Sequence, residues 1–132
     1  MSGSKPHLWV RIVVPDIGAI GPGKIDLLVA IDDEHSISAA ARKLGMSYRR
    51  AWLLLDDTRR VAGTDVVETF AGGAERGGAT LTEAGRRLIA AYNRIVETAN
   101  KAVADELEGL VVRPEKPPKS VPAKAKRRPR AS

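Results

Sequence analysis

Apolar residues recur along the chain in short blocks, and the spacing within each block indicates the element that it forms. Residues 7–14 are rich in β-branched and aromatic side chains and have a proline on each side, which predicts a strand. Residues 15–23 hold three glycines and two prolines and predict a loop. Apolar residues in 24–34 fall close to helical spacing, so a first helix is expected there.

Two more helices are predicted next, with a tight turn between them. Ser36 or Ser38 can cap a short second helix, and Gly45 is a typical residue just past its end. Ser47 can cap a third helix over residues 48–62. Two helices joined by a short glycine-containing turn are the outline of a helix-turn-helix motif.

A hairpin and a long helix are expected after this motif. Residues 66–70 and 79–81 predict two strands, and the intervening segment is rich in glycine. Thr82 can cap a helix whose apolar residues are spaced by four and three, the pattern of a heptad seam. The seam residues are Leu88, Tyr92, Ile95, Ala99 and Ala102. The expected fold is mainly α with a small β-sheet, a winged helix-turn-helix with a dimerisation helix over about residues 82–110.

The charge of the chain is concentrated at its C-terminus. The net charge is +6, and residues 113–132 carry eight basic residues and one acid. This stretch therefore has a charge of +7, which leaves 14 basic and 15 acidic residues, a charge of −1, to the remainder. We expect one domain over residues 1–111 and a disordered basic tail over 112–132, either a plain solvated terminus or a tether to DNA.

Several classes of protein are disfavoured by the composition. The chain has no cysteine, which excludes disulfides and thiolate chemistry. His7 and His35 have no partners at metal-ligand spacing, so no metal site is expected. No catalytic arrangement of side chains is visible, and we expect neither an enzyme nor a cofactor. Without an apolar run long enough for a membrane span, a cytoplasmic, nucleoid-associated protein is expected.

The start of the predicted third helix carries the residue types that contact DNA. Tyr48, Arg49 and Arg50 lie in its first turn, where recognition helices meet base edges. Arginine can form a bidentate contact with guanine, and if Arg50 makes one, its replacement by Ala should relax base preference; an equal loss on all sequences would mean that Arg50 touches only phosphate. Backbone N–H groups and the Ser47 hydroxyl can hold a phosphate. The alternative is an ordinary surface helix with two solvated arginines.

The predicted hairpin tip and Trp52 each leave two interpretations open. Arg76 lies among the glycines of the tip and could extend along phosphates or into the minor groove, as in a wing. The alternative is a flexible turn with no partner. Trp52 can contact bases or pack within the domain.

Three strings of residues together resemble a known family. They are Ser36-Ile-Ser-Ala-Ala-Ala41, Leu44-Gly-Met-Ser-Tyr-Arg-Arg-Ala-Trp52 and Leu81-Thr-Glu-Ala-Gly-Arg86. Across roughly residues 8–104 the chain is similar to the N-terminal DNA-binding domain of the molybdate-responsive ModE regulators, relatives of the LysR-type winged helices. We expect no molybdate-binding domains alongside it.

The resemblance implies a dimeric winged helix whose third helix enters the major groove. It assigns DNA contact to eight residues: Ser47, Tyr48, Arg49, Arg50 and Trp52 on the recognition helix, Arg76 and Thr80 in the wing, and Thr82 near the DNA backbone.

Three functions remain open from the sequence. The first is a sequence-specific transcriptional regulator that binds a palindromic site as a homodimer. The second is a nucleoid-type DNA binder with little sequence preference, and the third is a winged-helix module for protein interaction. Double-stranded DNA and a second copy of the chain are the expected partners, and an unknown effector or protein partner is left open.

Overall fold

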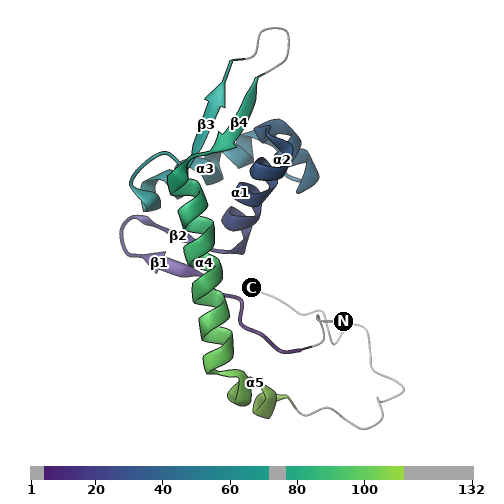
Figure 1. Cartoon of the computed structure of the whole chain (residues 1–132), viewed down its shortest axis with the longest axis vertical. Helices are drawn as coiled ribbons and strands as arrows, with labels where there is room; N and C mark the ends of the chain where they lie inside the picture. The colour runs from purple at the N-terminus through teal and green to yellow at the C-terminus, as the bar shows by residue number, and fades with distance from the viewer. Residues whose placement is uncertain (1–4, 72–76, 112–132) are drawn as a thin grey trace, which may run out of the picture.

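The computed structural model describes residues 5–71 and 77–111, and it is mainly helical with two small antiparallel sheets (Figure 1). The fold class expected from the sequence, a winged helix-turn-helix, is confirmed. The helices are α1 (Pro22–Glu34), α2 (Ile37–Lys43), α3 (Tyr48–Ala62), α4 (Glu83–Ala102) and α5 (Ala104–Leu110). The strands are β1 (Ile12–Val14), β2 (Gly18–Ile20), β3 (Val67–Phe70) and β4 (Gly78–Leu81).

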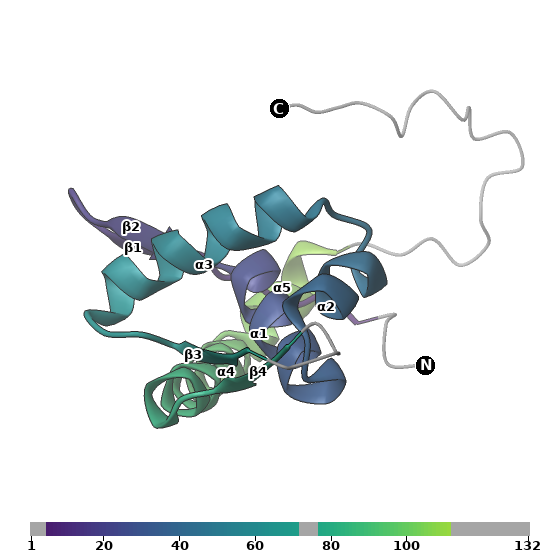
Figure 2. The ribbon, with the colours of Figure 1, turned by 90° about the horizontal axis from the view of Figure 1, so that it is seen from above.

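Helices α1, α2 and α3 pack around the main apolar core, and Figure 2 shows the three helices from above. Leu28 and Ile31 of α1 are fully buried, and Ala40 and Ala51 bring α2 and α3 close to them. Small side chains at these two positions let the helices approach closely; Ala40 belongs to the alanine run after Ser36, and Ala51 lies on α3. The α1 helix begins at Pro22, two residues before the expected start, because proline is well suited to the first helical position.

The turn between α2 and α3 follows the sequence prediction. Ser36 caps α2 by accepting a hydrogen bond from the Ala39 amide at 3.0 Å. Gly45 then adopts φ +71°, a conformation that glycine adopts at little cost. The Met46 amide donates to the Ala41 carbonyl at 2.9 Å, which closes the turn and directs the chain into α3.

The wing is the β3–β4 hairpin, in which Val67 pairs with Leu81 and Phe70 with Gly78. It is joined to the helical core along β4, where the Ala79 amide donates to the His35 carbonyl just past the end of α1 at 3.0 Å. Buried Ala79 and Leu81 face the main core from β4. The wing therefore has a fixed direction relative to the three helices, and its strands extend from them in Figure 1.

The first hairpin differs from the prediction in two ways. Only Ile12–Val14 is a strand within the expected 7–14, and the expected loop over 15–23 contains strand β2. The two strands join through a turn in which the Ile17 amide donates to the Val14 carbonyl at 3.0 Å. The loop prediction took Gly18 as a turn residue, whereas it is the first residue of β2 and lies against α3, where a Cβ would be 3.0 Å from Val61.

Residues 5–11, here called the arm, are held against α4. The Asn100 side chain accepts a hydrogen bond from the Leu8 amide at 2.7 Å, and the Tyr92 hydroxyl donates to the Val10 carbonyl at 2.5 Å. Burial, with a smaller contribution from the Asp26 charge, raises the pKa of Tyr92, a direction consistent with a hydroxyl that donates. The arm thus has a defined path without belonging to a sheet.

The long C-terminal helix is divided. It was expected over about residues 82–110, but it is interrupted at Val103, which separates α4 from α5. The expected seam also divides, because Leu88 and Tyr92 pack on the domain while Ile95 is 46% exposed. Thr82 caps α4 as predicted, and α4 runs from the base of the wing past the β1–β2 hairpin (Figure 1). No helix within residues 5–71 and 77–111 is long and apolar enough to cross a membrane.

Candidate nucleic-acid interface

The first turn of α3 is exposed and is fixed by its cap. The Ser47 hydroxyl oxygen accepts a hydrogen bond from the Arg50 amide at 3.0 Å, as the sequence predicted. A hydroxyl that accepts one bond can still donate its hydrogen, so Ser47 retains a donor for an oxygen outside the protein. Tyr48, Arg49 and Arg50 are all exposed around this turn.

The buried stripe of α3 determines where the three side chains point. Ala51, Leu55 and Thr58 face the core. At about 100° per residue, Arg49 lies nearly opposite this stripe and points directly outward. Arg50 lies on one flank of the helix, and Tyr48 lies on the other. The side chains of the adjacent residues Arg49 and Arg50 therefore point toward different surroundings. Their positions in the sequence alone do not reveal this difference.

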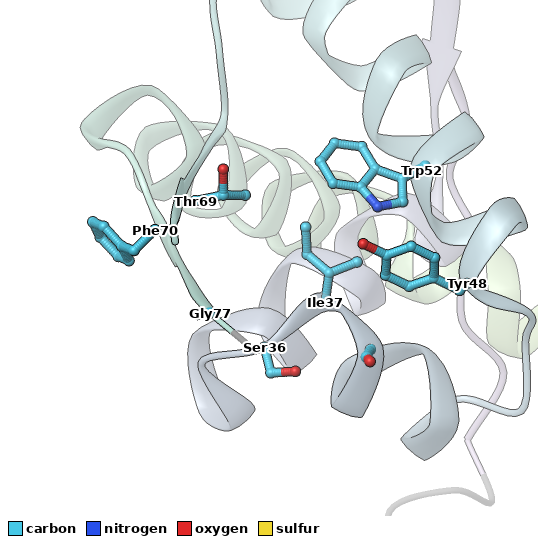
Figure 3. A pocket seen from close by; sticks show the side chains of 9 residues that line it. Ser36, Ile37, Tyr48, Trp52, Thr69, Phe70 and Gly77 are labelled. Atoms are coloured by element: carbon cyan, nitrogen blue, oxygen red, sulfur yellow. The ribbon is translucent and has the colours of Figure 1, made fainter. Parts of the chain in front are cut away.

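A cleft of about 420 Å³ separates the Tyr48 flank of α3 from the wing (Figure 3). The Tyr48 and Trp52 rings meet edge to face there, with centroids 6.3 Å apart. Thr69 of β3 lies across from them, while the Phe70 ring points away from the pair (Figure 3). Trp52 is 41% exposed, so part of its indole remains available to a partner. The cleft leaves the two rings open at the junction of helix and wing.

Carboxylates neutralise the basic residues farther along α3. Asp56 pairs with Arg59 at 2.9 Å and with Arg60 at 3.3 Å, and Asp57 also pairs with Arg60. The hydrogen bond from Arg59, together with the charges of both arginines, lowers the pKa of Asp56 despite an opposing desolvation effect. These contacts leave the positive character of α3 at its N-terminal end.

The arginines around the N-terminal end of α3 differ from Arg59 and Arg60 in their contacts with carboxylates. Across residues 5–71 and 77–111, no salt bridge includes Arg42, Arg49 or Arg50. Arg42 belongs to the last turn of α2 and was not among the residues predicted from the sequence. Because Arg42 stands just before the Gly45 turn that leads into α3, it could have been identified from the sequence as a further candidate site residue.

The three residues expected in the wing or at the start of the helix after it are Arg76, Thr80 and Thr82. Arg76 lies outside the described residues. Thr80 is half-buried in β4 and is paired with Glu68 in the register of the hairpin. Thr82 is at the base of the wing, where its hydroxyl donates to the Asp65 carbonyl at 2.8 Å and accepts from the Gly85 amide. This gives Thr82 a structural role in joining the wing to α4.

Comparison with known proteins agrees with this architecture. Residues 23–86 match the family model described as bacterial regulatory helix-turn-helix protein, lysR family. The molybdenum-pterin-binding protein MopB of Rhodobacter capsulatus is 44% identical over 85 residues, which cover 64% of this chain and 32% of MopB. The DNA-binding transcriptional dual regulator ModE of Escherichia coli (strain K12) is 37% identical over 81 residues, which cover 61% of this chain and 31% of ModE.

The chain thus spans about a third of the length of these relatives. Among solved structures, the protein in the crystal structure of the CbnR DBD–DNA complex has a TM-score of 0.53 and 20% sequence identity. The match covers 67% of this chain and 97% of that one, which shows a shared fold.

Proposed function

We propose that the chain is a sequence-specific DNA-binding transcription regulator. The premise is that residues 23–86 match the helix-turn-helix model of the lysR family and that the chain is similar to ModE and MopB, in line with the resemblance noted in the sequence. The observation that supports the proposal most strongly is the capped first turn of α3. It presents Arg49 outward with Arg50 and Tyr48 on its two flanks. A major groove has base edges at its floor and a phosphate backbone on each side, which is the same arrangement of contacts.

The individual contacts follow from these positions. Arg49 reads a base edge, and the Ser47 hydroxyl donates to a phosphate. Trp52 and Tyr48 cover the backbone and bases beside the wing, where the cleft leaves their rings exposed. The wing, with Arg76 and Thr80, follows the adjacent minor groove. On this proposal the protein works at the nucleoid.

The exposed side of α4 supports a homodimer on a palindromic site. Ala91, Ile95, Thr98 and Ala102 are spaced by four, three and four residues, so they share one stripe of the helix. The stripe adjoins the side on which Leu88 and Tyr92 pack on the domain. The small alanine and threonine side chains beside a single isoleucine permit close approach of a second α4 helix. A twofold dimer would place two recognition helices about 34 Å, or a multiple of this, apart.

Replacing Ile95 by Ala is expected to weaken the dimer about tenfold, because each partner loses a buried aliphatic side chain at the seam. Sedimentation equilibrium of the full chain over a range of concentrations measures this change. Val29→Ala is the matched control, since Val29 of α1 is an aliphatic residue of similar exposure, 40% against 46% for Ile95. Equal dimer strength in the two variants would contradict the assignment of the stripe with Ala91, Ile95, Thr98 and Ala102 to the dimer interface.

Selection from a random duplex library tests the main proposal. The full chain and a second form ending at Val111 are each incubated with the library near physiological salt, and the bound fraction is sequenced. We expect a palindromic motif from both forms. Binding without a motif would indicate an architectural DNA binder, and the absence of binding would indicate a protein-interaction module or a missing effector. The difference in salt dependence between the two forms measures whether the basic tail acts as a tether.

A further inference from the structure

A second hollow adjoins α3 on the side opposite the wing. Its volume is about 500 Å³, and its walls come from the arm, the start of α1 and the first half of α3. Arg11 lines it from the arm, Arg50 and Leu54 from α3, and Lys24 from α1. Two arginines from segments far apart in the sequence thus open onto one space.

The basic residues that line this hollow differ in whether they already have partners within the protein. The Lys24 ammonium donates to the Ala19 carbonyl at 2.7 Å and lies 3.7 Å from an Asp57 oxygen, so it joins β2 to α3. Arg11 and Arg50 are exposed, and neither belongs to a salt bridge in the described part of the chain. Lys24 therefore has a structural role, while the two guanidinium groups remain available for an anion.

The arm holds Arg11 in place before any partner arrives. The Val10 carbonyl, one residue earlier, accepts the Tyr92 hydroxyl at 2.5 Å, and the Leu8 amide is bound by Asn100 at 2.7 Å. The stem of Arg11 passes over Gly21, since a Cβ at Gly21 would lie 3.6 Å from Arg11 Cγ. A side chain positioned in this way loses less conformational entropy on binding than one on a free terminus.

We propose that Arg11 and Arg50 together bind the sugar–phosphate backbone of DNA on the side of α3 opposite the wing. The proposal rests on the function proposed above. A helix in the major groove lies between two backbones, and the Tyr48 flank faces the one beside the wing. The other backbone then meets Arg50 and, next to it, the arm. The arm acts as a second flanking element, and its contact is to phosphate and independent of sequence.

The test compares Arg11→Gln with Lys5→Gln in the full chain. Both substitutions remove one positive charge from the arm, but Lys5 lines a different hollow, beside α5. The affinity of each variant is measured by fluorescence anisotropy over a salt series, with a duplex selected from the library and with a scrambled duplex. Arg11→Gln is expected to lower affinity several-fold for both duplexes and to reduce the slope of log K against log salt by about one per half-site. Lys5→Gln should change neither.

Three results would overturn the proposal. Arg11→Gln could match Lys5→Gln in affinity and slope, which would remove the arm from the interface. It could weaken only the selected duplex, in which case Arg11 reads a base. If the unmodified chain binds neither duplex, the proposed function itself fails, and this outcome is distinct because it appears before any variant is compared.

Discussion

Gly85→Ala is expected to destabilise the fold by about 3 kcal/mol or more, because a Cβ at this position would collide with backbone. The Cβ would lie 2.3 Å from the Val66 carbonyl oxygen and 3.3 Å from its carbon. That oxygen already accepts a hydrogen bond from the Thr82 amide at 3.0 Å, so it cannot move away without losing the bond. Overpacking against backbone costs about 1–3 kcal/mol, and the lost bond adds about 1 kcal/mol.

Thermal unfolding followed by circular dichroism measures the effect, and the melting temperature should fall by more than about 10 °C. Gly23→Ala is the matched control. Gly23 is also in the first turn of a helix, but a Cβ there meets nothing within 4 Å. Alanine at position 23 should leave stability unchanged or raise it by up to about 1 kcal/mol. A similar melting temperature for both variants would show that α4 does not approach Val66 as closely as described.

The close approach at Gly85 also explains the string Leu81-Thr-Glu-Ala-Gly-Arg86. Thr82 caps α4 and binds the Asp65 carbonyl, and Gly85 admits the Val66 carbonyl against the helix. The string was identified from the sequence as a family resemblance, and its Thr82 was assigned to the DNA backbone. The structure supplies a packing reason for both residues. Local sequence cannot reveal such a reason, because Val66 and Gly85 meet only in the folded chain.

The starts of α2, α3 and α4 could be predicted because their signals are local. Ser36, Ser47 and Thr82 each cap a helix with a hydroxyl, and Gly45 turns the chain between α2 and α3. Strand β2 was missed because its Gly18 was interpreted as a loop residue, whereas its small size admits Val61 of the distant helix α3. Tertiary contacts that override local propensity do not appear in the spacing of apolar residues.

The sequence predicted which residues belong to the candidate site, but it did not predict the directions of their side chains. Position in the first turn of α3 identified Tyr48, Arg49 and Arg50 together. Their directions depend on which side of α3 is buried, and the presence of Arg11 nearby depends on the path of the arm. That path is set by Tyr92 and Asn100, which lie 82 and 92 positions from their partners in the arm. Contacts of that range follow from the packing of α4 on the domain.

Arg49→Ala is expected to relax base preference at one position of each half-site, at a cost of about 1–3 kcal/mol for the preferred duplex. The reason is the direction of the side chain, which lies opposite the buried stripe of α3 and is free of salt bridges within the described residues. Repeating the library selection with the variant measures the change in base preference. One position of the motif should lose its preference, while the other positions keep theirs.

Arg50→Ala is the informative comparison, because it removes the same charge from the next residue. Arg50 lies on the flank that shares a hollow with Arg11, so its loss should weaken all duplexes alike and leave the motif unchanged. The sequence alone predicted base contact by the arginine pair without separating its two members, and the result decides which of the two reads a base. A motif altered by Arg50→Ala and unchanged by Arg49→Ala would mean that α3 enters the groove rotated toward the arm. Arg11 would then face bases in place of phosphate, and both assignments would have to be exchanged together.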